Sequence, residues 1–121
     1  MADVQSLEVF RRAYRLSLDL HRASQRWPKA EQYGGVADQV RRASKSVCAL
    51  LVEGAGRQAA SDGEFRRYVV MAIGSADEAK LWCRYAVDLG FASEEAGRAW
   101  QSECTEIARM LQGMRRVRSD S

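Results

Sequence analysis

The sequence predicts an all-α protein that folds as one antiparallel, up-down four-helix bundle. Apolar residues recur at spacings of three and four along four long segments, as they do on the buried face of a helix. Short connections between segments of similar length favour antiparallel neighbours. The chain has 121 residues, of which 46% are hydrophobic and 29% charged, so residues 1–121 have the size and composition of a single globular domain.

The first helix is predicted over about residues 7–26, with Ser6 as its N-cap. Its apolar residues form two lines, one of Val9, Ala13, Leu16 and Leu20 and the other of Phe10, Tyr14 and Leu18. A bundle needs only one such line, so the second predicts a contact with a further surface. Trp27-Pro28 is expected to end the helix, because the residue before a proline avoids the helical conformation.

The second helix is predicted over about residues 33–52, and Gly54-Ala55-Gly56 is expected to stop it. Its core line consists of Val36, Val40, Ala43, Val47, either Leu50 or Leu51, and Gly54. Beside that line runs a stripe of polar and small residues, namely Gln39, Arg42, Ser46, Ala49 and Glu53. A mixed stripe of this kind suits a subunit interface better than open solvent.

The third helix is predicted over about residues 62–89, because Ser61-Asp62-Gly63-Glu64 has the form of a capping box and Gly90 can end a helix. Its core line is made mostly of small residues, namely Phe65, Val69, Ala72, Ala76, Ala79, Cys83 and Ala86. Small residues let a neighbouring helix approach closely. A second mixed stripe consists of Met71, Ser75, Glu78, Trp82 and Tyr85.

The fourth helix is predicted over about residues 94–116. Ser93 is its expected N-cap, and Glu94 and Glu95 place negative charge in its first turn, where the helix dipole favours it. Its core line consists of Ala96, Trp100, Cys104, Ile107, Leu111 and Met114.

The motifs of several known catalytic and metal sites are missing from the sequence. His21 is the one histidine, whereas a di-iron bundle needs two Glu-x-x-His motifs. The three cysteines have no C-x-x-C spacing. Gly74-Ser75 lies outside a G-x-S-x-G motif, and Gly54-Ala55-Gly56 is no phosphate-binding loop. We therefore expect no enzyme, no catalytic residue, no metal and no cofactor.

The ends and the hydropathy predict a cytoplasmic protein without a membrane partner. No apolar run approaches the roughly 18 residues that a membrane-spanning helix needs. Residues 1–6 lack the basic and apolar regions of a secretory signal.

The charges give two open interpretations. The net charge is +3, with 16 arginines and 3 lysines. Some charges have partners four residues away, among them Glu8 with Arg12 and Arg15 with Asp19. The basic residues in excess are either solvated or face phosphate groups of RNA or DNA. The candidates that face nucleic acid are Arg41, Lys45, Arg66, Arg67, Arg115 and Arg116.

Several short motifs, in order and at matching spacing, resemble the four-helix-bundle proteins of intervening sequences in bacterial 23S rRNA genes. The resemblance covers roughly residues 7–114. It rests on Leu7-x-Val9-Phe10-x-x-Ala13, Trp27-Pro28-x-x-Glu31-x-Tyr33-Gly34, Gln39-x-Arg41-Arg42-Ala43-x-x-Ser46-Val47, Glu53-Gly54-x-Gly56-Arg57, Phe65-x-x-Tyr68, Ala72-Ile73-Gly74-Ser75-x-x-Glu78 and Leu89-Gly90-Phe91. The sequence departs from the pattern at Phe10, Gly35 and Leu50, where relatives usually carry tryptophan, leucine and asparagine.

This resemblance implies a four-helix bundle that assembles into a homopentamer, and it implies no defined reaction. A more distant resemblance is to the accessory variability protein of diversity-generating retroelements. That family looks like a basic pentameric barrel that binds nucleic acid and a reverse transcriptase, which by fold analogy suggests nucleic acid as a partner here.

Three functions follow as hypotheses. The first is a non-enzymatic, ring-forming oligomeric scaffold with affinity for nucleic acid, whose interface or polar network contains Phe10, Tyr14, Gln39, Arg42, Glu53 and Glu78. In it, Arg42 is expected to form a partly buried ion pair with Glu53 or Glu78 of a neighbouring helix or subunit. The second is a protein-binding module for a neighbouring gene product. The third is a weak ribonuclease, because Arg15 and His21 resemble the Arg-x4-6-His motif of an all-α ribonuclease superfamily.

Overall fold

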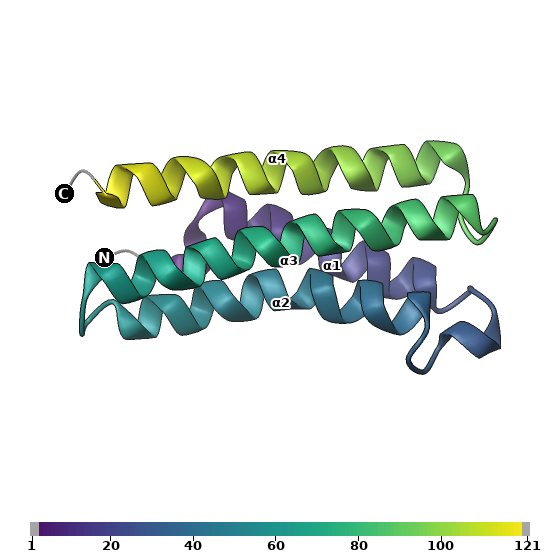
Figure 1. The fold of residues 1–121 in the computed structure, drawn as a ribbon, viewed down its shortest axis with the longest axis horizontal. Helices are drawn as coiled ribbons and strands as arrows, with labels where there is room; N and C mark the ends of the chain where they lie inside the picture. Colours follow the sequence, from purple (N-terminus) through teal and green to yellow (C-terminus); the bar gives the residue numbers. More distant parts are fainter. Residues whose placement is uncertain (1–2, 120–121) are drawn as a thin grey trace.

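Four long helices pack in chain order into an up-down bundle, which confirms the predicted fold class (Figure 1). The computed structural model describes residues 3–119, and the side chains of residues 3–115. The helices are α1 (Glu8–Ser24), α2 (Val36–Arg57), α3 (Asp62–Asp88) and α4 (Glu94–Ser119), with short 3-10 turns η1 (Val4–Ser6) and η2 (Lys29–Glu31). Both α1 and α3 pack against α2 and α4, so α1 and α3 lie diagonally across the bundle, with α3 in front of α1 in Figure 1.

The start of α1 differs from the prediction that Ser6 is its N-cap. The helix begins at Glu8, and Leu7 occupies the N-cap position without a capping side chain. Ser6 instead belongs to η1, where its hydroxyl donates to the Asp3 carbonyl at 2.7 Å. The helix also ends earlier than expected, at Ser24.

Trp27 lies in the connection after α1, beyond the end of the helix, and packs against aromatic residues from the other half of the bundle. Its side chain is buried. Its ring centroid lies 6.2 Å from that of Phe91, which follows α3, and 6.3 Å from that of Trp100 on α4. This aromatic contact ties the connection after α1 to the other half of the bundle.

The predicted bounds of the second helix are wrong at both ends. At its start, Gly34 has a φ of 78°, and the Glu31 carboxylate accepts a hydrogen bond from Val36 N at 2.8 Å, so α2 begins at Val36. At its other end the helix continues through Gly54 to Arg57. A Cβ on Gly54 would lie 2.7 Å from Tyr68 Cβ, so this glycine serves the close packing of α2 on α3.

The signals around α3 and α4 act largely as predicted. Ser61 Oγ accepts a hydrogen bond from Glu64 N at 3.0 Å, while the Glu64 carboxylate pairs with Arg67 instead of completing a capping box. Gly90 has a φ of 81° and follows α3 in a Schellman motif. Ser93 Oγ accepts from the first turn of α4 at 3.1 Å.

The predicted core lines face inward. Every residue of the α3 line is buried, and of the two alternatives on α2 Leu51 is buried and Leu50 half-buried. On α4, the middle of the line is buried and its outer members, Ala96, Trp100 and Met114, are half-buried. The small α3 residues let both α2 and α4 pack closely against it.

Over residues 3–119, no helix combines the length and apolar character that a membrane span requires. Over the same part of the chain, His, Cys, Asp and Glu nowhere gather in a group of three or more that could hold a metal ion.

Candidate interaction surfaces

The two mixed stripes predicted on separate helices meet on one side of the molecule. Ser75 Oγ donates to Ser46 Oγ at 3.0 Å, and the Tyr68 hydroxyl donates to the Glu53 carboxylate at 3.1 Å. Both bonds join α2 to α3. The antiparallel packing of the two helices therefore combines the stripes into one surface, which we call the α2–α3 face.

Arg42 and its predicted partners do not meet within the subunit. Arg42 Nε lies 3.0 Å from an Asp38 carboxylate oxygen, and the arginine side chain is 74% exposed. A hydrogen bond from Gly34 N and then the bond from Arg42 hold the pKa of Asp38 below its ordinary value. The expected pairing of Arg42 with Glu53 or Glu78 inside one chain is wrong. A pairing across two subunits stays a prediction.

The other polar residues predicted for the interface, Gln39, Glu53 and Glu78, are spread over the helices of the α2–α3 face. Gln39 is half-buried near the start of α2, and Glu78 is exposed on α3. Glu53 also faces Arg57 at 3.7 Å. Trp82 packs against Tyr85 with ring centroids 5.4 Å apart, and its buried indole N–H has no acceptor among the described residues.

The side of α3 that points away from the core carries an apolar line that sequence reasoning missed in part. Its side chains are between 40% and 54% exposed. We call this line the α3 outer stripe, and it consists of Val70, Met71, Leu81, Tyr85 and Leu89. Only Met71 and Tyr85 belonged to a predicted stripe. The signal was a second set of apolar residues at helical spacing on α3, masked by the stronger core line.

A second exposed apolar site lies on α1. The rings of Phe10 and Tyr14 stack at 6.1 Å, with Phe10 buried and Tyr14 51% exposed. Of the two predicted interface residues, only Tyr14 therefore offers a broad surface. Phe10 and Tyr14 line a hollow of about 410 Å³ together with three polar residues. We call this hollow the α1 patch, and it consists of Gln5, Phe10, Arg11, Tyr14 and Arg15.

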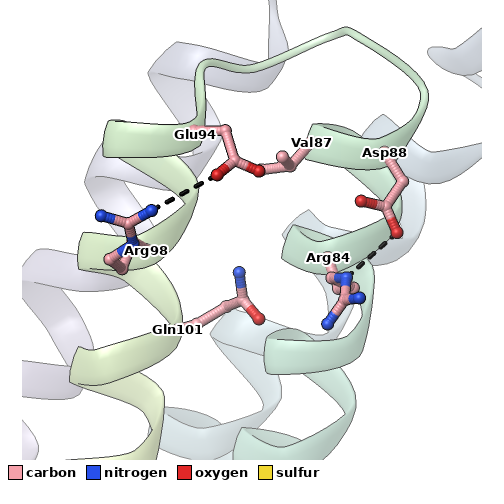
Figure 2. Close-up of a pocket in the computed structure, with 6 residues that line it drawn as sticks. All are labelled: Arg84, Val87, Asp88, Glu94, Arg98 and Gln101. Carbon is pink, nitrogen blue, oxygen red and sulfur yellow. Dashed lines mark hydrogen bonds and ion pairs between the residues drawn. The ribbon is translucent and has the colours of Figure 1, made fainter.

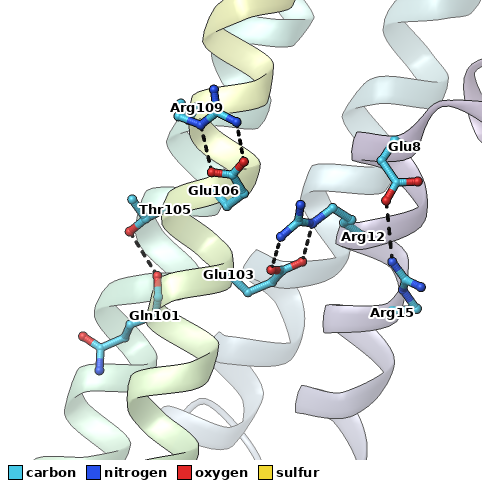
Figure 3. Close-up of polar contacts among 8 residues, drawn as sticks. All are labelled: Glu8, Arg12, Arg15, Gln101, Glu103, Thr105, Glu106 and Arg109. Atoms are coloured by element: carbon cyan, nitrogen blue, oxygen red, sulfur yellow. Dashed lines mark hydrogen bonds and ion pairs between the residues drawn. The ribbon is translucent and has the colours of Figure 1, made fainter.

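An ion pair that the sequence did not reveal joins α1 to α4 (Figure 3). Arg12 Nε donates to one oxygen of Glu103 at 2.9 Å, and its Nη2 donates to the other at 2.6 Å. The two side chains are 28% and 29% exposed. The hydrogen bonds raise the pKa of Arg12 and lower that of Glu103. Glu8, the expected partner of Arg12, instead faces Arg11 and Arg15.

Two of the predicted nucleic-acid candidates gather around His21. Lys45 Nζ lies 3.0 Å from His21 Nδ1. Burial, and then the positive charges of Lys45, Arg41 and Arg22, hold the pKa of His21 below its ordinary value. We call Arg22, Arg41 and Lys45 the basic cluster.

Arg41 also has a structural task. Its Nη1 donates to Ser24 Oγ at 2.9 Å and to the Gln32 side chain at 3.1 Å, and its Nη2 donates to the Gln32 carbonyl at 3.1 Å. These bonds fasten the connection between α1 and α2 to α2. Arg41 is therefore occupied by hydrogen bonds within the subunit, and Lys45 and Arg22 are the stronger candidates in the basic cluster for contact with nucleic acid.

The other basic candidates belong to the start of α3 and the end of α4, which lie at the end of the bundle away from the connection between α1 and α2 (Figure 1). Arg67 pairs with Glu64 and lies over the Tyr68 ring at 5.0 Å. Arg66 is half-buried and Arg115 is exposed. The side chain of Arg116 is outside the described residues. The structure thus separates the five candidates with described side chains into two groups.

A further hollow of about 280 Å³ lies where α3 turns into α4 (Figure 2). Its two arginines are each paired with a carboxylate, Arg84 with Asp88 at 3.0 Å and Arg98 with Glu94 at 3.3 Å. Neither of these arginines offers an unpaired charge to a phosphate group, so this hollow is a weaker candidate than the basic cluster.

Comparison with known proteins gives a fold relative and a family. A solved structure of a protein with unknown function from the S23 ribosomal protein family of Bacteroides thetaiotaomicron is similar to this chain, with a TM-score of 0.77, over 88% of this chain and 96% of that one. The two are 18% identical, so this likeness concerns the fold. A search of curated proteins gave no match. The model of the 23S rRNA-intervening sequence protein family matches residues 5–113, nearly the whole chain, and the protein therefore belongs to that family.

Proposed function

We propose that the protein is a non-enzymatic scaffold that assembles into a ring of identical subunits and binds nucleic acid. The α3 outer stripe carries this proposal. A monomer would leave five large apolar side chains along one side of α3 and its C-cap about half exposed to water, and exposed apolar surface of this kind marks interaction sites. The family resemblance implies five subunits.

The mass of the protein in solution tests the assembly. At micromolar concentration, sedimentation equilibrium or native mass spectrometry should give the mass of one discrete oligomer, an integer multiple of the 13.6 kDa chain. The interface should include Tyr14 and Glu78. A monomeric mass would contradict the scaffold and favour the alternative, a protein-binding module whose partner covers the same apolar stripe.

The basic cluster supports the nucleic-acid part of the proposal. Lys45 Nζ lies 3.0 Å from His21 Nδ1, and Arg22 follows His21 directly in α1, so positive charges gather there. A ring would repeat this cluster in every subunit, and several weak contacts made at once bind one nucleic acid more tightly than a single contact does. The family is described by an intervening sequence of 23S rRNA, which makes structured RNA the first probe.

The ribonuclease alternative depends on Arg15 and His21. These side chains have different neighbours, since Arg15 faces Glu8 at 3.9 Å and His21 contacts Lys45. Incubation of RNA with the purified protein and with His21→Ala decides this point. Cleavage that disappears in the variant would favour the ribonuclease over the scaffold. RNA that stays intact with the parent protein would support the non-enzymatic scaffold.

A further inference from the structure

We propose that subunits join head to tail, with the α1 patch of one copy against the α3 outer stripe of the next. This inference rests on the proposed self-assembly and adds which two surfaces meet. The occupant of the α3 outer stripe is therefore a second copy of this chain.

The two surfaces match in their apolar parts. The α1 patch is a hollow whose lining includes the buried Phe10 ring and the half-exposed Tyr14 ring. On α3, Leu81 and Tyr85 stand about half-exposed on the face opposite the core. Aliphatic and aromatic side chains that enter an aromatic-lined hollow lose water from both sides, which is the usual centre of a stable interface.

The two surfaces also match in charge. Arg11 and Arg15 flank the α1 patch, are mostly exposed, and share the single carboxylate of Glu8 at 3.7 and 3.9 Å. Asp77 and Glu78 lie within the span of the α3 outer stripe, and neither has an ion pair among the described residues. Contact between the surfaces would pair these opposite charges.

The same charges disfavour symmetric pairing. Two α1 patches placed together would bring arginines against arginines, and two α3 outer stripes would bring carboxylates against carboxylates. Like charges across an interface cost free energy and suppress that arrangement. The charge pattern therefore selects contact between unlike surfaces.

The positions of the helices make such a contact directional. Since α1 and α3 lie diagonally across the bundle, their outer surfaces belong to different sides of the subunit (Figure 1). An interface between two different surfaces is heterologous, and it leaves one surface of each kind free for the next copy. Repetition then closes a ring when the rotation between neighbours divides the circle.

Two blocking variants test the pairing. Tyr14→Asp should block the α1 patch, and Leu81→Asp should block the α3 outer stripe. Each variant alone should be monomeric, whereas a mixture of the two should form a one-to-one heterodimer in native mass spectrometry, because each retains the surface that the other lacks. Val52→Asp, an equally drastic change at an exposed valine of α2, should leave assembly unchanged. Circular dichroism melting of all three checks that they fold.

The outcomes separate this inference from the scaffold itself. A monomeric parent protein overturns both. An oligomeric parent whose mass is unchanged by Leu81→Asp or Tyr14→Asp overturns the pairing and leaves the scaffold standing. Monomeric single variants whose mixture stays monomeric also overturn it.

A charge exchange gives a second readout. Arg11→Glu with Arg15→Glu should raise the dissociation constant of assembly by roughly tenfold or more at low salt. Adding Asp77→Arg and Glu78→Arg to that variant should restore most of the loss. A loss without restoration would contradict the pairing of these charges.

Discussion

At the scale of single residues, the ion pair between Arg12 and Glu103 distinguishes itself from the other ion pairs of the described residues. It joins two residues of different helices that are 91 positions apart in the sequence, it is bidentate, and its side chains are less than one-third exposed. Most of the other pairs lie within one turn of a helix, and the most open of them, Arg98 with Glu94, is 79% and 78% exposed. Of these two pairs, only Arg12 with Glu103 is shielded enough from water for the loss of one partner to destabilise the protein markedly.

We predict that Arg12→Ala lowers the free energy of unfolding by about 1–3 kcal/mol, because it strands a partly buried carboxylate. The matched variant Arg98→Ala should cost less than about 0.5 kcal/mol. Urea denaturation measures both. Equal effects of the two variants would show that the α1–α4 pair is no stronger than a surface pair.

The same pair predicts a pH dependence. Hydrogen bonds from Arg12 hold the pKa of Glu103 below its ordinary 4.5. The folded state then binds fewer protons than the unfolded state, so this stabilisation is complete above the ordinary pKa and is lost as the pH falls through the folded-state pKa. Between about pH 6 and pH 3, stability should fall more steeply in the parent than in Glu103→Gln, which cannot titrate there. Parallel pH profiles would contradict this prediction.

At the scale of elements, the glycines at the end of α2 have different tasks. Gly54 is buried against α3, where a Cβ would meet Tyr68 Cβ at 2.7 Å, while a Cβ on Gly56 meets nothing within 4 Å. Both lie inside the helix. The same substitution should therefore have opposite effects at two positions only two residues apart.

We predict that Gly54→Ala destabilises the protein by about 1–3 kcal/mol, since the backbones of α2 and α3 must separate. Gly56→Ala should stabilise it by about 0.5–1 kcal/mol, because alanine favours the helix. Thermal and urea unfolding of both variants measure the difference. A stabilising Gly54→Ala would mean that the helices are not packed closely there.

At the scale of the whole molecule, the net charge of +3 is too small to attract nucleic acid by itself. The proposed assembly would change this, because a ring would repeat the basic cluster in every subunit while the paired arginines of α3 and α4 stay neutralised. Binding and assembly should therefore depend on each other.

We predict that structured RNA binds the assembled protein and that its affinity falls steeply between about 50 and 200 mM salt. Lys45→Glu with Arg22→Glu should weaken binding to all sequences alike. Charge reversal at Arg41 should do so too, but with a loss of stability, because Arg41 also holds the connection after α1. Fluorescence anisotropy measures binding, and no binding at 50 mM salt would remove nucleic acid from the proposed function.

The sequence by itself determined the bundle, its four helices and most of its buried residues. Helical spacing of apolar residues reports which side of a helix leaves water, and caps such as Ser93 and Gly90 act through neighbours in the chain. The short motifs also predicted the 23S rRNA-intervening sequence protein family, which the match to the family model confirms. These signals are local, so they can be read without knowing the fold. They fail where a local signal is overruled by packing, as at Gly54, which serves α3 rather than the end of its own helix.

Only the tertiary structure decided which residues from different helices meet. It gave Arg12 a distant carboxylate in place of Glu8, brought the stripes of α2 and α3 onto one face, and bound Arg41 to the connection after α1. It also placed the outer surfaces of α1 and α3 on different sides of the bundle. Such relations depend on the register and the rotation of packed helices, and the side-chain period of an isolated helix carries no information about either.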